Sequence, residues 1–359
     1  MRTLKRECFT RDWIDQKSRE IRTGNTFLEK CLHAFELLGR LQQEGLDFVF
    51  KGGTSLLLRL PDPKRLSIDI DIVSRESAAR LERILGRCIT TPFIGHDEDK
   101  RRHNRPPRRR HWNFGYNSIS PGSCPEPYVI LDVLEEDVLY NDVSEVEIRA
   151  PFIDADHAIR VRIPTIDNLL ADKLTAFAPN TIGQEYGDTH PEKIAKHFFD
   201  IGELFDHAES MHVIRDVYHR IASAEINYRR NERGLDVSQC LDDTIETARL
   251  VAGLAIDQQL HPDNSPVLRR GIDQLSGHLI GIAFGPRDAA VATAKAAYLA
   301  AAIKHDNMQP LDQVRFDSAR IAELADVAIE TRPVLNRLKQ ISPEAFYYWA
   351  MTEKLTESD

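Results

Sequence analysis

Hydrophobic positions recur with two different periods in the first part of the chain. From residue 26 to residue 44 they fall three or four positions apart, which is typical of an amphipathic helix that ends at Gly45. Residues 47–50 are a short apolar run, and residues 66–73 alternate apolar with polar side chains, as strands do. Between them, residues 54–60 have a helical pattern closed by two prolines. These patterns predict a helix, a strand, a short helix and a second strand.

The pattern changes near Pro164, where alternating segments give way to helical ones. We predict one helix and four strands before this point: residues 77–88, 112–117, 128–133, 146–149 and 159–163. After it, residues 168–177, residues 193–205 and several later segments up to residue 352 have a helical period. The prediction is an α+β fold, with an N-terminal mixed-sheet domain over residues 1–164 and an all-helical C-terminal domain over residues 165–359.

Composition narrows the class of protein. The chain has 359 residues, of which 42% are hydrophobic, so it is long enough for two cores and too apolar to be disordered. Its five cysteines are scattered, without a C-x-x-C pair, which disfavours a zinc ribbon or a disulfide framework. The most apolar stretch, residues 288–304, is rich in alanine and interrupted by Lys295, so we expect a packed helix there. We therefore expect a cytoplasmic protein with no signal peptide and no membrane partner.

Charge is distributed unevenly along the chain. A net charge of -9 disfavours a nucleic-acid partner, because phosphate contacts need Lys and Arg. One block is the exception, with seven positive charges in eleven residues: Lys100, Arg101, Arg102, Arg105, Arg108, Arg109 and Arg110. Such a block can be a solvated loop, but it is also where an acidic protein could contact RNA. We predict RNA binding at these seven residues.

Paired carboxylates lie on the second predicted strand. Residues i and i+2 of a strand share a face, so Asp69 and Asp71 are expected to point to one side. Hard carboxylate oxygens suit Mg²⁺ or Mn²⁺, and Asp132, on another predicted strand, is a candidate third ligand and general base. A polar strand face exposed to solvent is the alternative. The preferred interpretation is a metal site formed by Asp69, Asp71 and Asp132.

A glycine pair precedes these acids by one short helix. Gly52 and Gly53 join a strand to a helix start, where backbone N–H groups and the helix dipole favour a phosphate. Each signal alone is weak, but their order and spacing together favour metal-assisted nucleotidyl transfer, with in-line attack at the α-phosphorus and release of pyrophosphate. No P-loop or dinucleotide-binding glycine motif occurs in the sequence.

Four segments together resemble a known family. The chain contains, in order, FKGGTSL, RLSIDIDI, LLADKLTAF and KHFFDIGEL. Over roughly residues 25–210 it is similar to the AbiEii/AbiGii-type nucleotidyltransferase toxins, a branch of the polymerase-beta-like nucleotidyltransferase superfamily. The resemblance implies transfer of a nucleoside monophosphate from an NTP, with Mg²⁺ or Mn²⁺, to the 3′ end of tRNA. It also implies that this reaction blocks translation and that a cognate antitoxin is encoded nearby.

The resemblance also implies roles for individual residues. The nucleotide-binding set comprises Lys51, Gly52, Gly53, Thr54, Ser55, Arg65, Ser67 and Lys173. The catalytic set comprises Asp69, Asp71, Asp132, Lys173 and Asp200. The chain departs from the family in the last segment, where His197 stands in place of an acid.

Three alternatives stay open. Lys173 lies at the edge of an apolar helical stripe and needs a negative partner, which a triphosphate or Asp200 could supply; a purely structural ion pair between the two is equally compatible with the pattern. The same chemistry could act on a small molecule or a protein, in which case the arginine block would be dispensable. A catalytically degenerate module that binds RNA or a protein partner is the third possibility.

Overall fold

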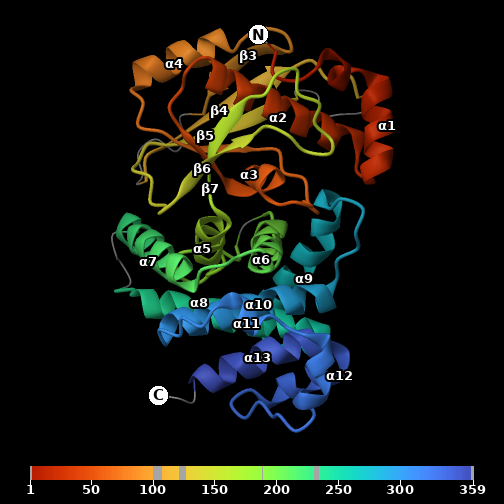
Figure 1. The fold of residues 1–359 in the computed structure, drawn as a ribbon, viewed down its shortest axis with the longest axis vertical. Helices are drawn as coiled ribbons and strands as arrows, with labels where there is room; N and C mark the ends of the chain where they lie inside the picture. The colour runs from red at the N-terminus through yellow and green to blue at the C-terminus, as the bar shows by residue number, and fades with distance from the viewer. Residues whose placement is uncertain (1, 100–106, 121–126, 188, 230–233, 357–359) are drawn as a thin grey trace. The chain divides into compact units, whose positions relative to one another are not determined.

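The structure is a computed structural model that describes residues 2–99, 107–120, 127–187, 189–229 and 234–356. The chain forms two compact units (Figure 1). The first comprises residues 1–165 together with residues 277–282, and the second comprises residues 166–276 and 283–359. The short return of residues 277–282 to the first unit has no signal in the hydrophobic pattern.

A five-stranded mixed sheet forms the centre of the first unit. Its strand order is β1-β2-β5-β4-β3, and only β2 and β5 run parallel. A separate two-stranded sheet pairs β6 with β7. The strands are β1 (Val49–Lys51), β2 (Ile70–Val73), β3 (Phe93–Glu98), β4 (Arg109–Tyr116), β5 (Tyr128–Leu134), β6 (Val143–Glu147) and β7 (Arg160–Pro164). The mixed sheet confirms the fold class predicted from the sequence.

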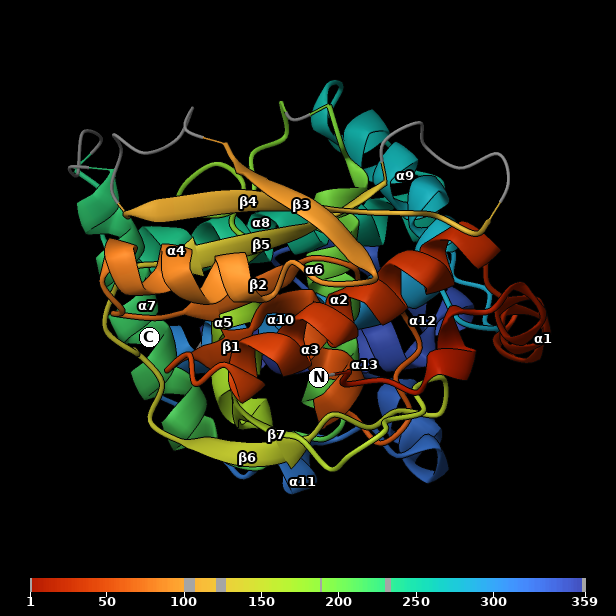
Figure 2. The ribbon, with the colours of Figure 1, turned by 90° about the horizontal axis from the view of Figure 1, so that it is seen from above.

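Helices cover one face of this sheet. Alternate residues of β4 are buried on that face, and the ring of Tyr116 stacks on His33 of α2 with centroids 3.7 Å apart. Seen from above, α2 and α4 lie over the sheet (Figure 2). The residues between the buried ones therefore point to the opposite face. The helices of this unit are η1 (Arg6–Phe9), α1 (Arg11–Ile21), α2 (Asn25–Gln43), α3 (Gly52–Arg59) and α4 (Ala78–Arg87).

The second predicted strand is shorter than its pattern indicated. Residues 66–73 alternate throughout, but β2 begins only at Ile70. The backbone before it has other partners: the Leu66 N–H donates to the carbonyl of His278 at 2.8 Å, and the Ile280 N–H donates to the carbonyl of Lys64 at 2.9 Å. The returning segment 277–282 thus pairs with residues 64–66, at the start of the predicted strand, and the strand assignment was wrong for residues 66–69.

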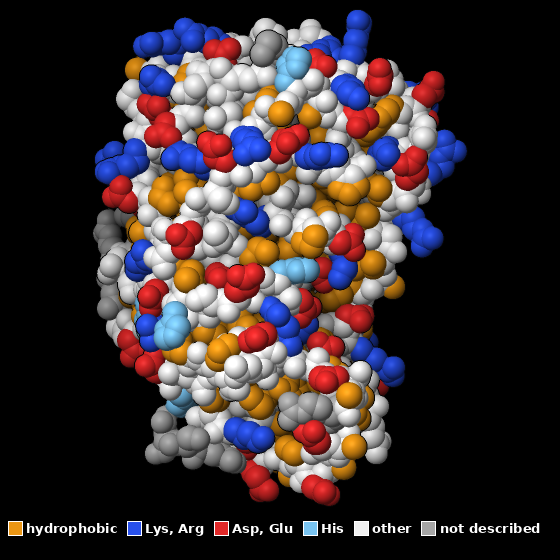
Figure 3. All heavy atoms as spheres, in the orientation of Figure 1, with side chains coloured by type: hydrophobic (Ala, Val, Ile, Leu, Met, Phe, Trp, Pro, Cys, Tyr) orange, Lys and Arg blue, Asp and Glu red, His pale blue; other side chains and the backbone are white. Residues whose placement is uncertain are grey.

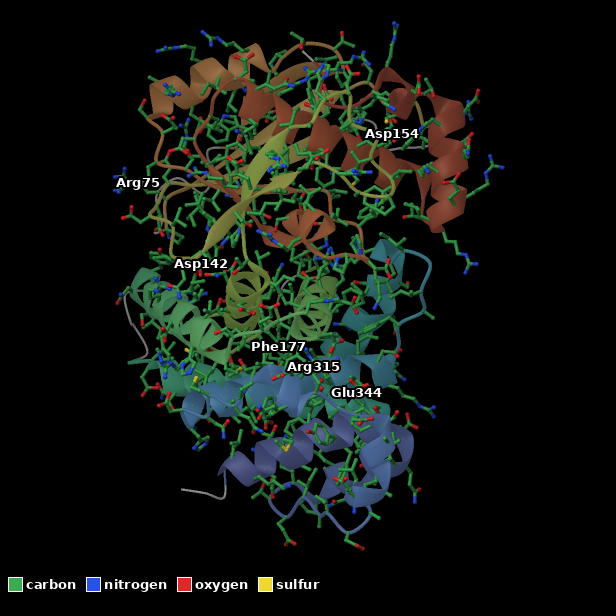
Figure 4. All side chains as sticks on the ribbon, in the orientation of Figure 1. Arg75, Asp142, Asp154, Phe177, Arg315 and Glu344 are labelled. Carbon is green, nitrogen blue, oxygen red and sulfur yellow. The ribbon has the colours of Figure 1, made fainter. Side chains whose placement is uncertain are left out.

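The second unit is helical throughout its described part. Most residues of the alanine-rich helix α10 are buried, and α10 packs closely on α6: a Cβ added to Gly202 would lie 2.8 Å from the Cβ of Ala292. Phe177 and Arg315 belong to this unit (Figure 4), and Arg315 donates to the carbonyl of Ala208. The helices of this unit are α5 (Ile166–Ala176), α6 (Glu192–Phe205), α7 (Met211–Tyr228), α8 (Val237–Ala255), α9 (Asn264–Leu275), α10 (Pro286–Lys304), α11 (Leu311–Val314), η4 (Ser318–Leu324), η5 (Pro333–Arg337), α12 (Leu338–Ile341) and α13 (Pro343–Thr356). The short helix η3 (Ser276–His278) leads from this unit into the returning segment 277–282 of the first.

Within the described ranges, no helix has the length and apolar character needed to cross a membrane. On the face drawn in Figure 3, basic and acidic side chains are interspersed over the first unit.

Candidate functional site

The glycine turn lies directly against an acidic side chain. β1 ends at Lys51 and α3 begins at Gly52, whose φ of 77° is unfavourable for other residues. A Cβ added to Gly52 would lie 2.1 Å from Oδ2 of Asp71, closer than any real contact. Glycine is therefore required here for two reasons, and the Asp71 carboxylate lies at the start of α3.

A cation and a hydroxyl flank the same helix start. A Cβ added to Gly53 would lie 2.7 Å from Nη2 of Arg65 and 3.0 Å from Oγ of Ser67. Arg65 is only 7% exposed. The combination of a helix N-terminus with a buried guanidinium favours an anion such as phosphate.

The two hydroxyl residues of the turn brace its backbone. Thr54 and Ser55 are both buried. The hydroxyl of Thr54 donates to the carbonyl of Asp69 at 2.5 Å, and that of Ser55 donates to the carbonyl of Gly52 at 2.8 Å. In this structure their side chains thus support the turn and connect it to the acidic segment, whereas the exposed groups of the turn are backbone atoms.

Four polar residues form a row across neighbouring strands. Lys51 is in register with Asp71 on β2, Asp71 with Asp132 on β5, and Asp132 with His111 on β4. Directly opposite residues share a sheet face, and neighbouring strands lie about 4.8 Å apart. His111 alternates with the buried Trp112, so the row lies on the face opposite α2. The register thus brings Asp71 and Asp132 together, as the sequence predicted, and adds a histidine.

His111 is the residue that the sequence analysis missed. Its Nδ1 is hydrogen-bonded to Oδ1 of Asp132, and the side chains are 13% and 32% exposed. Its Nε2 is buried and has no hydrogen-bond partner in the part of the chain that the structure describes. The alternation of β4 placed His111 opposite the aromatic face, but only the register with β5 identifies its partner.

The carboxylates suit a divalent cation by their chemistry. Asp71 and Asp132 supply hard oxygen donors from adjacent strands. No group of three or more His, Cys, Asp and Glu side chains within the described ranges is placed to hold a metal. Two carboxylates are nevertheless sufficient for Mg²⁺, which usually takes one or two from the protein and the rest from water and substrate phosphates. The donor set therefore fits Mg²⁺ bound together with a nucleotide.

Asp69 lies one residue before the start of β2. Its carbonyl accepts the Thr54 hydroxyl. The strand register therefore does not include Asp69, and its role as a metal ligand stays a prediction. The in-register neighbour of Asp71 is Asp132.

Lys173 and Asp200 pair with each other within the second unit. Nζ of Lys173, on α5, lies 2.9 Å from Oδ2 of Asp200, on α6, and the side chains are 9% and 3% exposed. Each neutralises the other in a nearly dry environment, where removal of one partner is costly. The sequence left the choice between a triphosphate and Asp200 open, and in this structure the ammonium of Lys173 pairs with Asp200.

The arginine block is described only at its end. Lys100, Arg101, Arg102 and Arg105 lie outside the described residues. Arg108 and Arg109 are exposed, and alternation places Arg109 on the same face of β4 as His111.

Arg110 lies on the opposite face of β4 and is committed to other contacts. Its guanidinium pairs with Glu98 at 2.6 Å and Glu82 at 3.0 Å and lies 4.4 Å from the centroid of the Trp112 ring. Although burial opposes the charge, the surrounding glutamates raise the pKa of Arg110. This arginine stabilises the sheet, and its predicted role in RNA binding gains no support from its position.

Comparisons with known proteins identify the family. A sequence model described as nucleotidyl transferase AbiEii toxin, type IV toxin–antitoxin system, matches residues 36–272, about two thirds of the chain. No curated protein matches in sequence. Similar solved structures include a candidate nucleotidyltransferase from H. pylori, with 17% identity, TM-score 0.39 and coverage of 81% of this chain and 97% of that one. Another is JHP933 from Helicobacter pylori, with 15% identity, TM-score 0.42 and coverage of 83% and 99%. From the family match over most of its length, the chain belongs to the AbiEii nucleotidyltransferase toxins of type IV toxin–antitoxin systems.

Proposed function

We propose that this nucleotidyltransferase moves a nucleoside monophosphate from an NTP to the 3′ end of tRNA, in a reaction that depends on Mg²⁺ or Mn²⁺, and thereby blocks translation. The observation that carries the proposal is the in-register pair Asp71 and Asp132, one member of which lies against the glycine turn. This arrangement combines acidic oxygens and a phosphate-binding helix start within one unit. The family adds an antitoxin partner, and a cytoplasmic location is part of the proposal.

The nucleotide phosphates are assigned to the start of α3. Backbone N–H groups at Gly53 and the guanidinium of Arg65 bind the triphosphate, with Ser67 beside them. Lys51, at the end of β1 and in register with Asp71, adds a positive charge to the same row. These groups orient the α-phosphate relative to the carboxylates.

Asp71 and Asp132 would hold the divalent cation, and Asp69 is the predicted third contributor. When bound, the cation would act as a Lewis acid on the phosphate oxygens. Asp132 also receives the proton of the attacking hydroxyl, whose oxygen bonds to the α-phosphorus while pyrophosphate leaves. A hydrogen bond already occupies Oδ1 of Asp132, so Oδ2 is the oxygen assigned to these tasks.

RNA is the acceptor that the charge distribution favours. Arg109 is exposed on the carboxylate face of β4 and continues directly from the predicted RNA-binding block. A local basic segment lets a protein with a net charge of -9 approach a phosphate backbone. The proposal therefore keeps this segment, without Arg110, as the RNA-binding surface.

The test is incubation with each α-³²P-labelled NTP, Mg²⁺ and total RNA, compared with the Asp71→Asn enzyme. We expect label on tRNA with the wild-type enzyme and at least about 100-fold less with the variant. Label on protein or on small molecules, and not on tRNA, would show that these are the acceptors. The absence of label with every NTP, including reactions supplied with tRNA and Mn²⁺, would overturn the proposal in favour of a binding module.

A further inference from the structure

A partly buried hydrogen bond joins His111 to a proposed metal ligand, Asp132. Asp132 accepts a hydrogen bond at Oδ1 from Nδ1 of His111, and the two residues are directly opposite each other on β5 and β4. His111 is mostly buried, with a side chain 13% exposed. A carboxylate rotates easily about its last torsion, so a donor held by the neighbouring strand restricts that rotation.

We propose that His111 is a positioning residue that donates its Nδ1–H to Oδ1 of Asp132 and thereby presents Oδ2 to the divalent cation. This inference rests on the proposed function, because it assigns a purpose to Asp132 as a ligand. Donation from Nδ1 means that the neutral ring has its second nitrogen, Nε2, without a proton. Hydrogen bonds to ligating carboxylates are a recognised way of fixing ligand geometry.

The position of His111 favours this role over ordinary core packing. Core residues of β4 point to the α2 face, as Trp112 does, whereas His111 points to the polar face. There it terminates the row that begins at Lys51 and runs through Asp71 and Asp132. A histidine chosen only for packing would have no reason to bond the acid that faces Asp71.

The size of the effect follows from other metal sites. Removal of a hydrogen bond to a metal ligand typically weakens metal affinity by about 10-fold to 100-fold, and activity can fall by a similar factor. The loss should appear in metal binding itself, before any reaction. It should also depend on the donor at the δ position and not on the size of the side chain.

Two amide variants separate the donor from packing. In His111→Asn the amide nitrogen occupies the same bonded position as Nδ1, so the donor to Asp132 is retained. In His111→Gln that position is the amide carbon, Cδ, which cannot donate a hydrogen bond, and the amide nitrogen lies one bond further out. Both variants are polar and neutral, so they differ mainly in the donor at this position.

The experiment measures Mn²⁺ binding by electron paramagnetic resonance, with the full chain and a non-hydrolysable NTP analogue. We expect His111→Gln to bind Mn²⁺ about 10-fold to 100-fold more weakly than wild type, and His111→Asn to stay within about threefold. Thermal melts of all variants check folding. Equal weakening by both variants, or wild-type affinity in His111→Gln, would overturn the inference.

Asp71→Asn and Asp132→Asn distinguish this inference from the proposed function. If these two variants bind Mn²⁺ weakly while His111→Gln binds it normally, the metal site stands and the positioning role is wrong. If the wild-type chain binds no Mn²⁺ with the nucleotide analogue, the proposed metal dependence itself is wrong, and the inference falls with it.

Discussion

Replacement of Gly52 by alanine tests whether the Asp71 carboxylate must lie against the start of α3. The new methyl group would be 2.1 Å from Oδ2 of Asp71, and real contacts of this kind do not fall below 3.0 Å. The carboxylate must therefore move by roughly 1 Å, since the backbone on both sides is held by β1, β2 and α3. The perturbation displaces a proposed ligand without removing it.

The expected cost divides into a stability part and an activity part. A residue with a side chain at φ 77° costs roughly 1 to 2 kcal/mol of unfolding free energy. A displacement of about 1 Å at a reacting centre can cost about 100-fold in rate. We therefore expect Gly52→Ala to fold, with a modest loss of stability and a loss of about 100-fold in kcat.

Gly45→Ala is the matched control. Gly45 has a φ of 73°, and an added Cβ would meet nothing within 4 Å, so this variant has the same backbone strain without a displaced side chain. Chemical denaturation measures stability, and transfer of label from an α-³²P NTP measures the rate. We expect equal stability losses for Gly45→Ala and Gly52→Ala, with full activity only in the former.

Full activity of Gly52→Ala would refute the reasoning. It would show that the Asp71 carboxylate can leave the turn without consequence. Loss of activity in both glycine variants would point to strain or misfolding and would remove the link to Asp71.

Three further predictions concern separate parts of the fold. Burial lowers the pKa of His33 from 6.5 to about 4. As the pH falls below 6.5, the unfolded chain therefore takes up a proton at this residue before the folded chain does. The free energy of unfolding should then fall by up to about 3 kcal/mol as the pH approaches 4. Urea titrations at several pH values should show this dependence reduced in His33→Phe, and an unchanged dependence would contradict it. Lys173→Met or Asp200→Asn should each cost about 3 to 5 kcal/mol of unfolding free energy. The double variant Lys173→Met/Asp200→Leu should recover much of this stability in thermal melts. If it recovers stability without transfer activity, the pair has a role in the reaction, whereas recovery of both indicates a structural pair. Arg110→Gln should lower the melting temperature and leave RNA labelling by the folded enzyme unchanged, and Arg109→Gln should do the reverse; the opposite results would move the RNA contact to the other face of β4.

Local periodicity was sufficient for the main elements of the fold. The helix around residues 26–44, the glycine-initiated helix and the two strands that follow the basic block could be predicted from spacing that reflects which side chains are buried. β3 was missed because Phe93–Glu98 has little apolar alternation and is an edge strand. The false strand at residues 66–69 had the correct pattern, but the backbone at its start, residues 64–66, pairs with residues 278–280, more than 200 positions away. Such long-range pairing has no local signal.

The candidate site was predictable in its acids and its glycines but not in its pairing. Gly52 and Asp71 were recognisable from residue type and order. That Asp71 faces Asp132, and that Asp132 bonds His111, depends on the strand order β2-β5-β4, which places strands far apart in sequence side by side. Arg110 is a residue whose predicted role gains no support from the structure. It was assigned to RNA binding because it belongs to the basic block, but alternation along β4 places its side chain next to Glu98 and Glu82.

The central claim is that Asp71 and Asp132 together support nucleotidyl transfer to RNA. The most direct measurement is parallel labelling of purified tRNA with α-³²P and γ-³²P forms of the same NTP, in the presence of Mg²⁺, by wild-type, Asp71→Asn and Asp132→Asn enzymes. We predict that only the α label enters tRNA, that pyrophosphate is released in equal amount, and that both variants lose at least about 100-fold of this transfer. Transfer of the γ label, or full transfer by either variant, would contradict the account.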